Sequence, residues 1–244
     1  MSAPISSNPA ADATAAPFVS LFDIAFLTNT EDVTELVLVR HGEQEADRVG
    51  GNVGSLIDPP LSARGQLQAE LVGRRLAGER IDVVYASPLA RAYDTGNAIA
   101  GHHGLEPRVI EALEEIKLWN TAPPDKTVLE LLGPVLSAGM RARMVAERKW
   151  DAYPYSEGSD VFRGRVVMAI DGIAANHPGE RVVIACHGGV INAYLAHHLG
   201  ITADMWFRPA HTAVNVVFAK GPTRSLRSIN DVRHLEHDAA LITH

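Results

Sequence analysis

Short apolar runs alternate with amphipathic segments along most of the chain. The runs at residues 35–39, 81–85 and 181–186 are rich in valine and almost continuously apolar, which is typical of strands buried on both faces. Apolar side chains repeat at helical spacing within residues 62–79, so this segment is predicted to be an amphipathic helix. Further helices are expected at 135–150, 160–176 and 189–199, a short edge strand near 108–110, and two closing strands at 213–219 and 225–230.

Strands that alternate with helices favour a mostly parallel sheet covered on both faces. The predicted fold class is therefore α/β, a three-layer α/β/α sandwich, with one catalytic domain over residues 35–244. Residues 119–158 interrupt the alternation with prolines, tyrosines and one helical stretch. We interpret them as a small insertion, and we expect a lid at about 117–158.

Residues 1–34 are predicted to be an N-terminal extension. Residues 1–16 consist largely of alanine, serine, proline and aspartate, which favours a flexible leader. Residues 17–29 are more apolar, and they are expected to pack either on the domain, as a strand or a helix, or against a partner subunit. A homodimer is therefore one possible assembly.

Composition narrows the class of protein. A chain of 244 residues is long enough for one sizeable domain, and its net charge of -7 argues against a basic nucleic-acid binder. Cys186 is the single cysteine, so no internal disulfide is possible, which fits a reducing compartment. The start of the chain lacks the basic-then-apolar order of a secretory signal, and no run is long enough to span a bilayer. We expect a cytoplasmic protein without membrane contact.

Three predicted strands end in polar residues. The first runs into residues 40–43 (Arg-His-Gly-Glu), the second into 86–88 (Ala-Ser-Pro) with Arg91 one turn further on, and the third into 187–189 (His-Gly-Gly). Ser87 and Pro88 suit the N-cap and the first turn of a helix. Because ligands of open α/β sheets bind beyond the carboxyl ends of strands, we expect these three ends to lie side by side.

The side chains at these strand ends suit a small dianion. Guanidinium groups match phosphate oxygens, and helix N-termini add unpaired N–H donors. Glycines after each histidine let a ligand approach the backbone. A neutral imidazole is a competent nucleophile at phosphorus, which makes His41 the candidate nucleophile, with Arg40, Arg91 and His187 holding the charge of the transferring group. Glu115, or its neighbour Glu114, is the candidate proton donor to the leaving alkoxide.

Several motifs together resemble the histidine phosphatase superfamily, the phosphoglycerate-mutase-like proteins. The resemblance covers residues 35–236 in the family's order, and several motifs in that order are far more specific than a lone Arg-His-Gly. The matching segments are 38–43 (LVRHGE), 58–62 (DPPLS) with 65 and 68–69, 87–92 (SPLARA) with Thr95, 186–189 (CHGG) and 230–235 (NDVRHL).

This resemblance implies a role for each matching residue. His41 would be the phosphorylated nucleophile, Arg40 and Arg91 would bind phosphate, and His187 would bind phosphate and stabilise the transition state. Gly188 belongs to the same phosphate-binding motif. The family's Leu-x-Glu pattern, matched at residues 113–115, places the acid at Glu115.

The expected activity is hydrolysis of a small phosphorylated metabolite through a phosphohistidine, without metal or other cofactor. A mutase-type isomerase is the first alternative, although family mutases carry a longer lid insertion. A non-catalytic module that binds phosphorylated ligands is the second. No Cys or carboxylate cluster joins the histidine pairs at 102–103, 197–198 or 234 and 237, so no metal site is predicted.

The chain also departs from the family pattern. Gln44 and Asp47 stand where the family often has Ser and Asn, and residues 116–120 replace its usual glycine and Trp-Glu-Gly. An aspartate near a phosphate pocket repels the substrate unless it is paired or turned away, so the pocket is expected to suit an unusual substrate. The loop at 48–57 receives no role. Cys186 is interpreted as a small buried hydrophobe.

Overall fold

The computed structural model describes residues 19–28, 31–45 and 52–244. Within them, six strands form one sheet in which β1 to β4 run parallel, while β5 is antiparallel to β1 and β6 is antiparallel to β5. The predicted α/β class is confirmed. In sheet order the strands are β3 (Arg108–Val109), β2 (Val83–Ala86), β4 (Arg181–Cys186), β1 (Thr34–Arg40), β5 (Val214–Lys220) and β6 (Thr223–Asp231).

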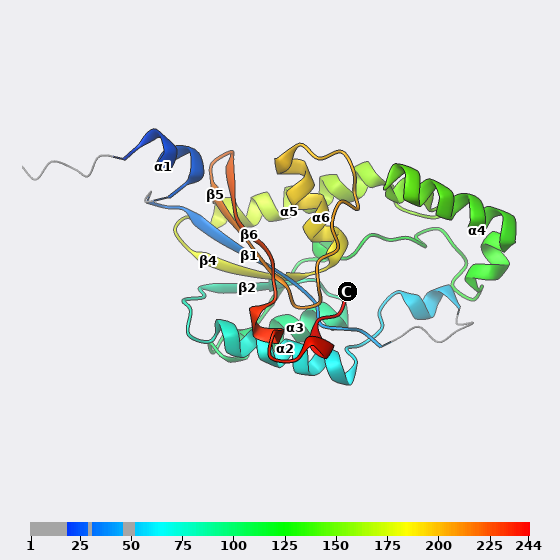
Figure 1. Ribbon diagram of the computed structural model, residues 1–244, viewed down its shortest axis with the longest axis horizontal. Helices are drawn as coiled ribbons and strands as arrows, with labels where there is room; N and C mark the ends of the chain where they lie inside the picture. The colour runs from blue at the N-terminus through cyan, green and yellow to red at the C-terminus, as the bar shows by residue number, and fades with distance from the viewer. Residues whose placement is uncertain (1–18, 29–30, 46–51) are drawn as a thin grey trace, which may run out of the picture.

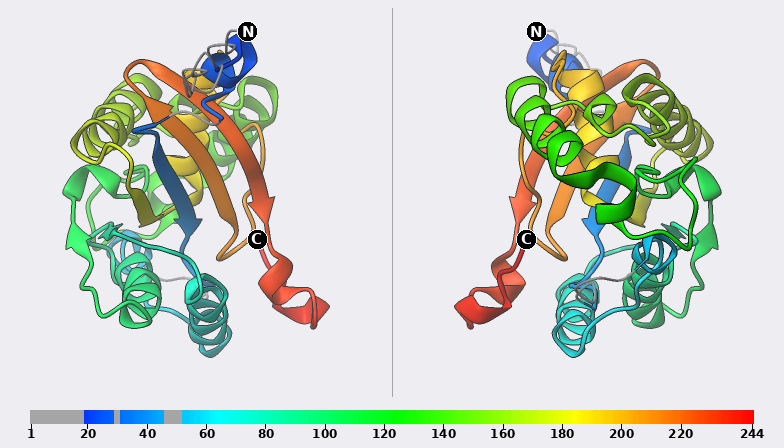
Figure 2. Two further views of the ribbon diagram at one scale, coloured as in Figure 1. Left: turned by 90° about the vertical axis from the view of Figure 1, so that its left-hand side faces the viewer. Right: turned by 90° about the vertical axis from the view of Figure 1, so that its right-hand side faces the viewer.

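Two helix layers cover opposite faces of the sheet (Figures 1 and 2). The alternation of side chains along β1 explains the two cores: Leu36 and Leu38 belong to one apolar cluster, and Val37 and Val39 to the other. The first cluster packs against α5 (Ser159–Asn176) and α6 (Gly188–Leu199), and the second against α2 (Ala63–Leu76) and α3 (Ala90–Gly101).

The segment beyond β3 contains one long helix, α4 (Val128–Glu147), at the end of the molecule that lies beyond the carboxyl ends of the parallel strands (Figure 1). We predicted a helix at 135–150. It begins earlier, because Thr127 and Glu130 form a capping box at its start. Gly133, at φ 58°, kinks it beside Pro134, and these two residues concealed the first turns in the sequence.

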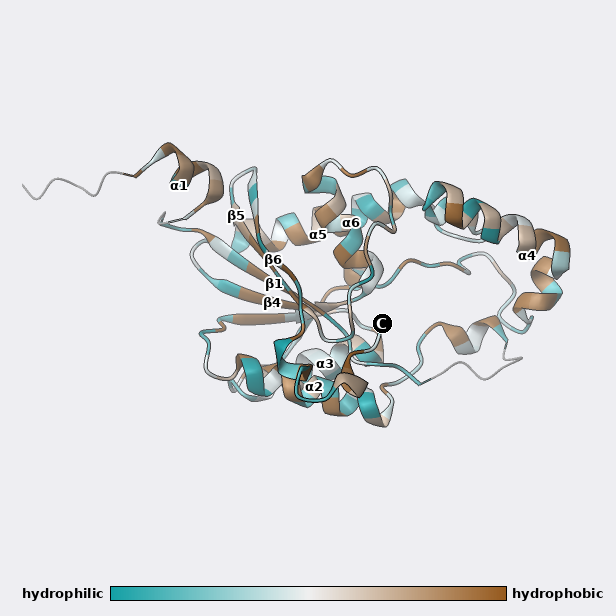
Figure 3. Cartoon of the chain, in the orientation of Figure 1, coloured by the Kyte–Doolittle hydropathy of each residue, from teal (hydrophilic) through white to brown (hydrophobic). Residues whose placement is uncertain are grey.

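The sequence left open whether the segment 17–29 contains a strand or a helix. Its residues 21–26 form a short helix, α1 (Leu21–Phe26). A capping box between Ser20 and Asp23 starts it, and none of its residues is buried. α1 lies next to β6 and is largely apolar, as its brown colour in Figure 3 shows. Its apolar side chains are exposed to solvent; Phe22 is 75% exposed. The leader expected at 1–16 lies outside the described residues, and the homodimer stays a prediction.

The start of α3 differs from the prediction. Its N-cap residue is Leu89, which makes no side-chain cap bond, so Ser87 is not the N-cap. Five 3₁₀ turns complete the described elements: η1 (Val53–Leu56), η2 (Glu111–Leu113), η3 (Trp150–Ala152), η4 (Arg233–Leu235) and η5 (Ala239–Leu241). None of the helices in the described ranges has the length and apolarity needed to cross a bilayer.

Candidate active site

A cavity of about 570 Å³ opens at the carboxyl ends of the parallel strands. Arg40, His41, Arg91 and Glu115 line it together, so four of the predicted site residues share one cavity. Gln44 lines it as well, whereas Asp47 lies outside the described residues. Apolar side chains make up most of the remaining wall: Leu56, Ile57, Leu89, Ile116, Leu118 and Trp119.

The central strand β4 brings the strand ends together. The backbone N–H of His41 donates to the carbonyl of Cys186 at 2.9 Å, and that of Ser87 donates to the carbonyl of Ala185 at 3.0 Å. His187 follows β4 directly. The residues after β1, β2 and β4 therefore lie side by side, as the strand-end argument predicted. Cys186 is fully buried, in agreement with its interpretation as a core residue.

The ring of His41 is held in one tautomer. Its Nδ1 lies 2.7 Å from the carbonyl oxygen of Gly42, and because a carbonyl only accepts, Nδ1 carries the proton and Nε2 keeps its lone pair. The Nε of Arg91 lies 3.3 Å from that Nε2. Burial, with the charges of His187, Arg91 and Arg40 nearby, holds the pKa of His41 well below its ordinary value. His41 is therefore neutral at pH 7, with its lone pair beside a guanidinium.

Arg91, which is buried, and Arg40, which is partly buried, line the same cavity as this ring. Arg91, 5% exposed in the first turn of α3, lies 3.3 Å from the carbonyl of Ile57 and 3.5 Å from the carboxylate of Asp58. Arg40 donates from Nη1 to the carbonyl of Pro209, and burial lowers its pKa to about 10. The buried Nε of Arg40 has no hydrogen-bond partner in the described part of the chain. A charged donor left unbonded in a pocket suits an anionic ligand.

His187 is completely buried, and its ring centroid lies 5.1 Å from that of His41. Its Nε2 lies 2.8 Å from the hydroxyl of Ser87, whose oxygen already accepts the N–H of Leu89 at 3.3 Å. The Ser87 hydroxyl can donate to Nε2, and in that arrangement the proton of neutral His187 is on Nδ1. Burial and the charges of Arg91 and Arg40 keep the pKa of His187 well below its usual range. Its Nδ1 is buried and lacks a partner among the described residues, as does the Nε of Arg40.

The two candidate acids are in different environments. Glu115 accepts from the N–H of Ile116 and from that of Gly189, each at 3.0 Å, so its carboxylate lies at the N-terminus of α6. Glu114 also lines the cavity, but its carboxylate pairs with the ammonium of Lys117 at 2.9 Å. The geometry therefore favours Glu115 as the acid.

The glycines after the histidines allow close packing within the protein. A Cβ on Gly189 would overlap the Glu115 carboxylate, and one on Gly42 would overlap the carbonyl of Gly65 at the start of α2. We expected these glycines to admit a ligand. For Gly42 and Gly189 the tight neighbours belong to the chain itself, whereas a Cβ on Gly188 would come no closer than 3.6 Å, to Nε of Arg40.

Three further residues support the site and were not predicted. Ser87 was assigned to a helix cap but bonds His187. Arg165 of α5 donates to the carbonyls of residues 112, 114 and 115 and pairs with Glu157, so it holds the turn that carries Glu115. The ring centroid of His211 lies 5.6 Å from that of His41. Each role depends on contacts between residues distant in sequence, so no local sequence pattern predicts it.

Within residues 19–28, 31–45 and 52–244, no three His, Cys, Asp or Glu side chains gather in a way that would hold a metal ion. His234, one of the histidines weighed above, instead bonds Arg75 and Thr212.

Comparison with known proteins agrees with this geometry. A family model described as histidine phosphatase superfamily (branch 1) matches residues 36–232. The chain is 33% identical over 219 residues to a metal-independent phosphoserine phosphatase of Arabidopsis thaliana, covering 84% of each chain. It is 30% identical over 213 residues to phosphoserine phosphatase 1 of Hydrogenobacter thermophilus, covering 83% of this chain and 95% of the relative.

A solved structure shares the fold. The crystal structure of phosphoserine phosphatase from Entamoeba histolytica in complex with 3-phosphoglyceric acid superimposes with a TM-score of 0.64 at 25% identity, over 83% of this chain and 99% of the other. The fold and the site thus define a phosphoglycerate-mutase-like α/β protein. This chain belongs to the histidine phosphatase superfamily, and the family predicted from the motifs is confirmed.

Proposed function

We propose that this protein is a metal-independent phosphomonoester hydrolase in which His41 takes the phosphoryl group and water then removes it. General phosphoester hydrolysis by a histidine phosphatase agrees with the relatives described above. The observation that carries the proposal is the tautomer of His41: the Gly42 carbonyl holds the ring proton on Nδ1, so a neutral Nε2 lone pair lies beside Arg91 in the cavity.

In the first step the Nε2 lone pair of His41 attacks phosphorus, and the bond to the leaving alcohol oxygen breaks. Protonated Glu115 gives its proton to that oxygen, so the alcohol leaves neutral. Arg40, Arg91 and the Nδ1–H of His187 hold the charge of the transferring group, which is the main contribution a protein makes to phosphoryl transfer. The N-terminus of α6, beginning at Gly188, adds backbone donors.

In the second step water attacks the phosphohistidine. Glu115, now a carboxylate, takes a proton from that water, the P–N bond breaks, and inorganic phosphate leaves. The two steps restore neutral His41 and protonated Glu115. Because one step needs a base and the other an acid, the same carboxyl group acts in both directions.

The apolar side chains that line the cavity support a proposal on the substrate. Leu56, Leu118 and Trp119 are apolar, and Ile57 beside them is 55% exposed. The ammonium of Lys117 is paired with Glu114. Apolar walls with few polar groups favour ligands with apolar surface. We therefore propose a small phosphate ester whose alcohol has a substantial apolar part, and we propose that residues 117–158 act as the lid over it.

The first experiment measures phosphate release, with EDTA present, from p-nitrophenyl phosphate, 1-naphthyl phosphate, phosphoserine and 3-phosphoglycerate. Turnover that survives EDTA and disappears in His41→Ala supports the hydrolase. A higher kcat/KM for the aryl esters than for phosphoserine supports the apolar leaving group, and the reverse order contradicts it. Interconversion of phosphoglycerates with a bisphosphate primer, faster than phosphate release, would replace hydrolase by mutase.

A further inference from the structure

The turn before β5 contains a residue in a conformation unusual for its type. Thr212 is completely buried, and its φ is 55°, in the left-handed region that β-branched residues rarely adopt. Such a conformation costs on the order of 1–3 kcal/mol and persists only where surrounding contacts enforce it. A glycine would avoid this strain, so the presence of threonine indicates that its side chain is needed.

The backbone of Thr212 contacts the segment that carries the nucleophile. Its N–H is shared between the carbonyl of Arg40, at 3.1 Å, and that of His41, at 3.3 Å. The N–H of Arg40 in turn donates to the carbonyl of Ala213 at 3.3 Å. The turn at 210–213 therefore supports residues 40 and 41 through hydrogen bonds in both directions.

A chain of hydrogen bonds with one consistent direction holds the Thr212 side chain. Nη1 of Arg75 lies 3.3 Å from Nδ1 of His234 and can only donate, so the proton of neutral His234 is on Nε2. That Nε2 lies 2.9 Å from the Thr212 hydroxyl and donates to it. The hydroxyl then donates to the carbonyl of His211 at 2.8 Å.

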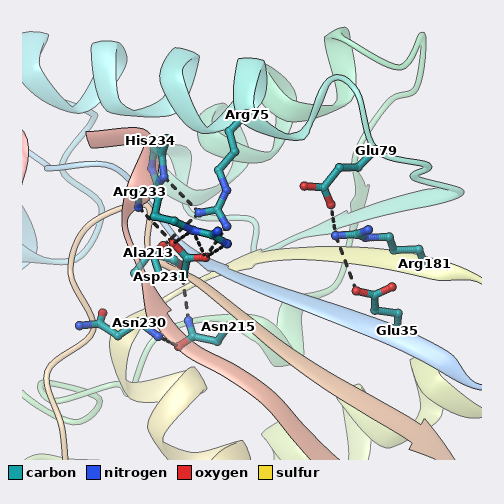
Figure 4. A network of polar contacts seen from close by, with 10 residues as sticks. All are labelled: Glu35, Arg75, Glu79, Arg181, Ala213, Asn215, Asn230, Asp231, Arg233 and His234. Atoms are coloured by element: carbon teal, nitrogen blue, oxygen red, sulfur yellow. Dashed lines mark hydrogen bonds and ion pairs between the residues drawn. The ribbon is translucent and has the colours of Figure 1, made fainter. Parts of the chain in front are cut away.

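Ion pairs hold the Arg75 end of this series of hydrogen bonds in place (Figure 4). Arg75 of α2 pairs with the carboxylate of Asp231 at 2.6 Å, and Arg233 pairs with the same carboxylate at 2.6 Å. Burial and the Arg75 charge lower the pKa of His234 to about 4, so at pH 7 its ring is neutral, as the donor sequence requires. Asn215 and Asn230 brace the same turn: the side-chain oxygen of Asn230 accepts the N–H of Ala210 at 2.8 Å, and that of Asn215 accepts the N–H of Asn230 at 2.8 Å.

The turn also places a ring beside the nucleophile. His211 packs with its centroid 5.6 Å from that of His41, and its Nδ1 lies 2.8 Å from the hydroxyl of Thr243. The backbone N–H of His211 donates to the carbonyl of Thr243 at 2.9 Å. Thr243 thus holds residue 211, and His234 holds residue 212. The ring of His41 has two histidine neighbours, His187 and His211.

We infer that His234 is a positioning residue for the nucleophile, acting through Thr212 to fix the backbone of residues 40–41 and the ring of His211 beside His41. The inference rests on the proposed role of His41 as nucleophile. His234 does not line the cavity, so we expect it to affect turnover through its hydrogen bond to Thr212 in the turn 210–213.

The first test is kinetic. In His234→Ala, kcat for p-nitrophenyl phosphate should fall about 10–100-fold while KM changes by less than about twofold, since small misplacement of a reacting group affects the transition state most. His234→Gln keeps an N–H donor of similar reach and should recover most of the loss. His237→Ala removes an exposed histidine three positions along the chain and should behave as wild type. Unchanged kcat in His234→Ala, with only a lower melting temperature, would overturn the inference.

The second test does not depend on turnover. Long-range ¹H–¹⁵N spectra of histidine-labelled protein at pH 7 should show His41 protonated on Nδ1 and His234 protonated on Nε2. Thr212→Val keeps the side-chain shape but removes the hydroxyl, and it should shift the ring resonances of His41, because the backbone of residues 40–41 loses part of its support. If the wild type shows these tautomers but no phosphatase activity, the proposed function fails and the positioning stands. If Thr212→Val leaves the His41 ring resonances unchanged in folded protein, the positioning fails.

Discussion

Single side chains at the site are placed by hydrogen bonds whose direction is forced. The Gly42 carbonyl can only accept and the Arg75 guanidinium can only donate, and these two facts determine which nitrogen of His41 and of His234 carries the proton. Glu115 has a similarly defined place, since both of its oxygens accept backbone N–H groups. The two carboxylates at 114 and 115 should therefore be separable by mutation.

Glu115→Gln should lower kcat about 10²–10⁴-fold for alkyl phosphates, whose alkoxide needs a proton, and much less for p-nitrophenyl phosphate, whose phenolate leaves without one. Glu114→Gln is the matched control and should lose less than Glu115→Gln on alkyl esters, because its carboxylate pairs with Lys117. The measurement is kcat across leaving groups of increasing pKa. Equal losses on both ester types would remove Glu115 from the acid role.

Gly189→Ala tests the same acid through packing. A Cβ at Gly189 would overlap the carboxylate of Glu115 and contact the ring of Phe162, so the acid must move. We expect kcat for alkyl phosphates to fall at least about tenfold, with a smaller effect on p-nitrophenyl phosphate. Gly172→Ala, a helical position with no atom within 4 Å of the added carbon, is the control and should keep full activity. An active Gly189→Ala enzyme with normal dependence on leaving group would contradict this placement.

The sequence alone predicted most of these site residues, because they stand at the ends of strands that the sequence pattern already identifies. Arg40, His41 and His187 each adjoin a valine-rich strand, so recognising the strands placed the residues. The roles of Ser87 and His211 were not accessible in the same way. The first depends on a contact with His187, 100 positions further along the chain, and the second on a turn that lies beside β1 only after folding.

Among the elements, α5 supports the turn that carries Glu115. Its Arg165 donates to three carbonyls of the turn 112–115 and pairs with Glu157, whose carboxylate accepts the N–H of Lys117 at 2.9 Å. One guanidinium thus connects the turn 112–115, and through Glu157 also Lys117, to helix α5. The helix itself was predicted from its spacing, but an arginine on it resembles any surface cation.

Arg165→Met should destabilise the fold by about 1–3 kcal/mol, because it leaves carbonyls and the Glu157 carboxylate without their donor. It should also reduce kcat more for alkyl than for aryl phosphates, since the acid turn loses its support. Urea unfolding gives the first quantity and the leaving-group series the second. Arg143→Met, which breaks an exposed pair with Glu147 on α4, is the control and should change neither by much. If stability falls while the leaving-group dependence stays as in wild type, Arg165 has no role in placing the acid.

For the whole molecule, the burial of the central strands follows from the strand pattern, whereas the arrangement of the less regular parts does not. Continuous apolar runs such as 35–39 and 181–186 have only one place in an α/β fold, the buried centre of the sheet, and there they lie. The segment 117–158 has no such constraint. Its helix was displaced by several residues in the prediction because the Gly133–Pro134 pair looks like a boundary, although the Thr127–Glu130 capping box was present in the sequence.

The same architecture buries several histidines in neutral form, which gives the whole molecule a pH dependence. Burial lowers the pKa of His211 to about 3 and of His234 to about 4, and holds those of His41 and His187 well below the usual value. In the unfolded chain each titrates near about 6.5. As pH falls below about 6.5, the unfolded state binds protons that the folded state refuses, so the free energy of unfolding decreases until the folded pKa is reached.

We therefore expect the free energy of unfolding, measured in urea, to be constant above about pH 7 and to fall steeply between about pH 6.5 and 5. This window lies above the ordinary range of carboxyl groups, so histidines dominate it. His234→Gln removes one such group and should reduce the slope near pH 5 by about 1.4 kcal/mol per pH unit. A stability that stays flat from pH 7 to 5 would mean that these rings gain protons without unfolding, and the neutral hydrogen-bond directions assigned to His41 and His234 would then be wrong.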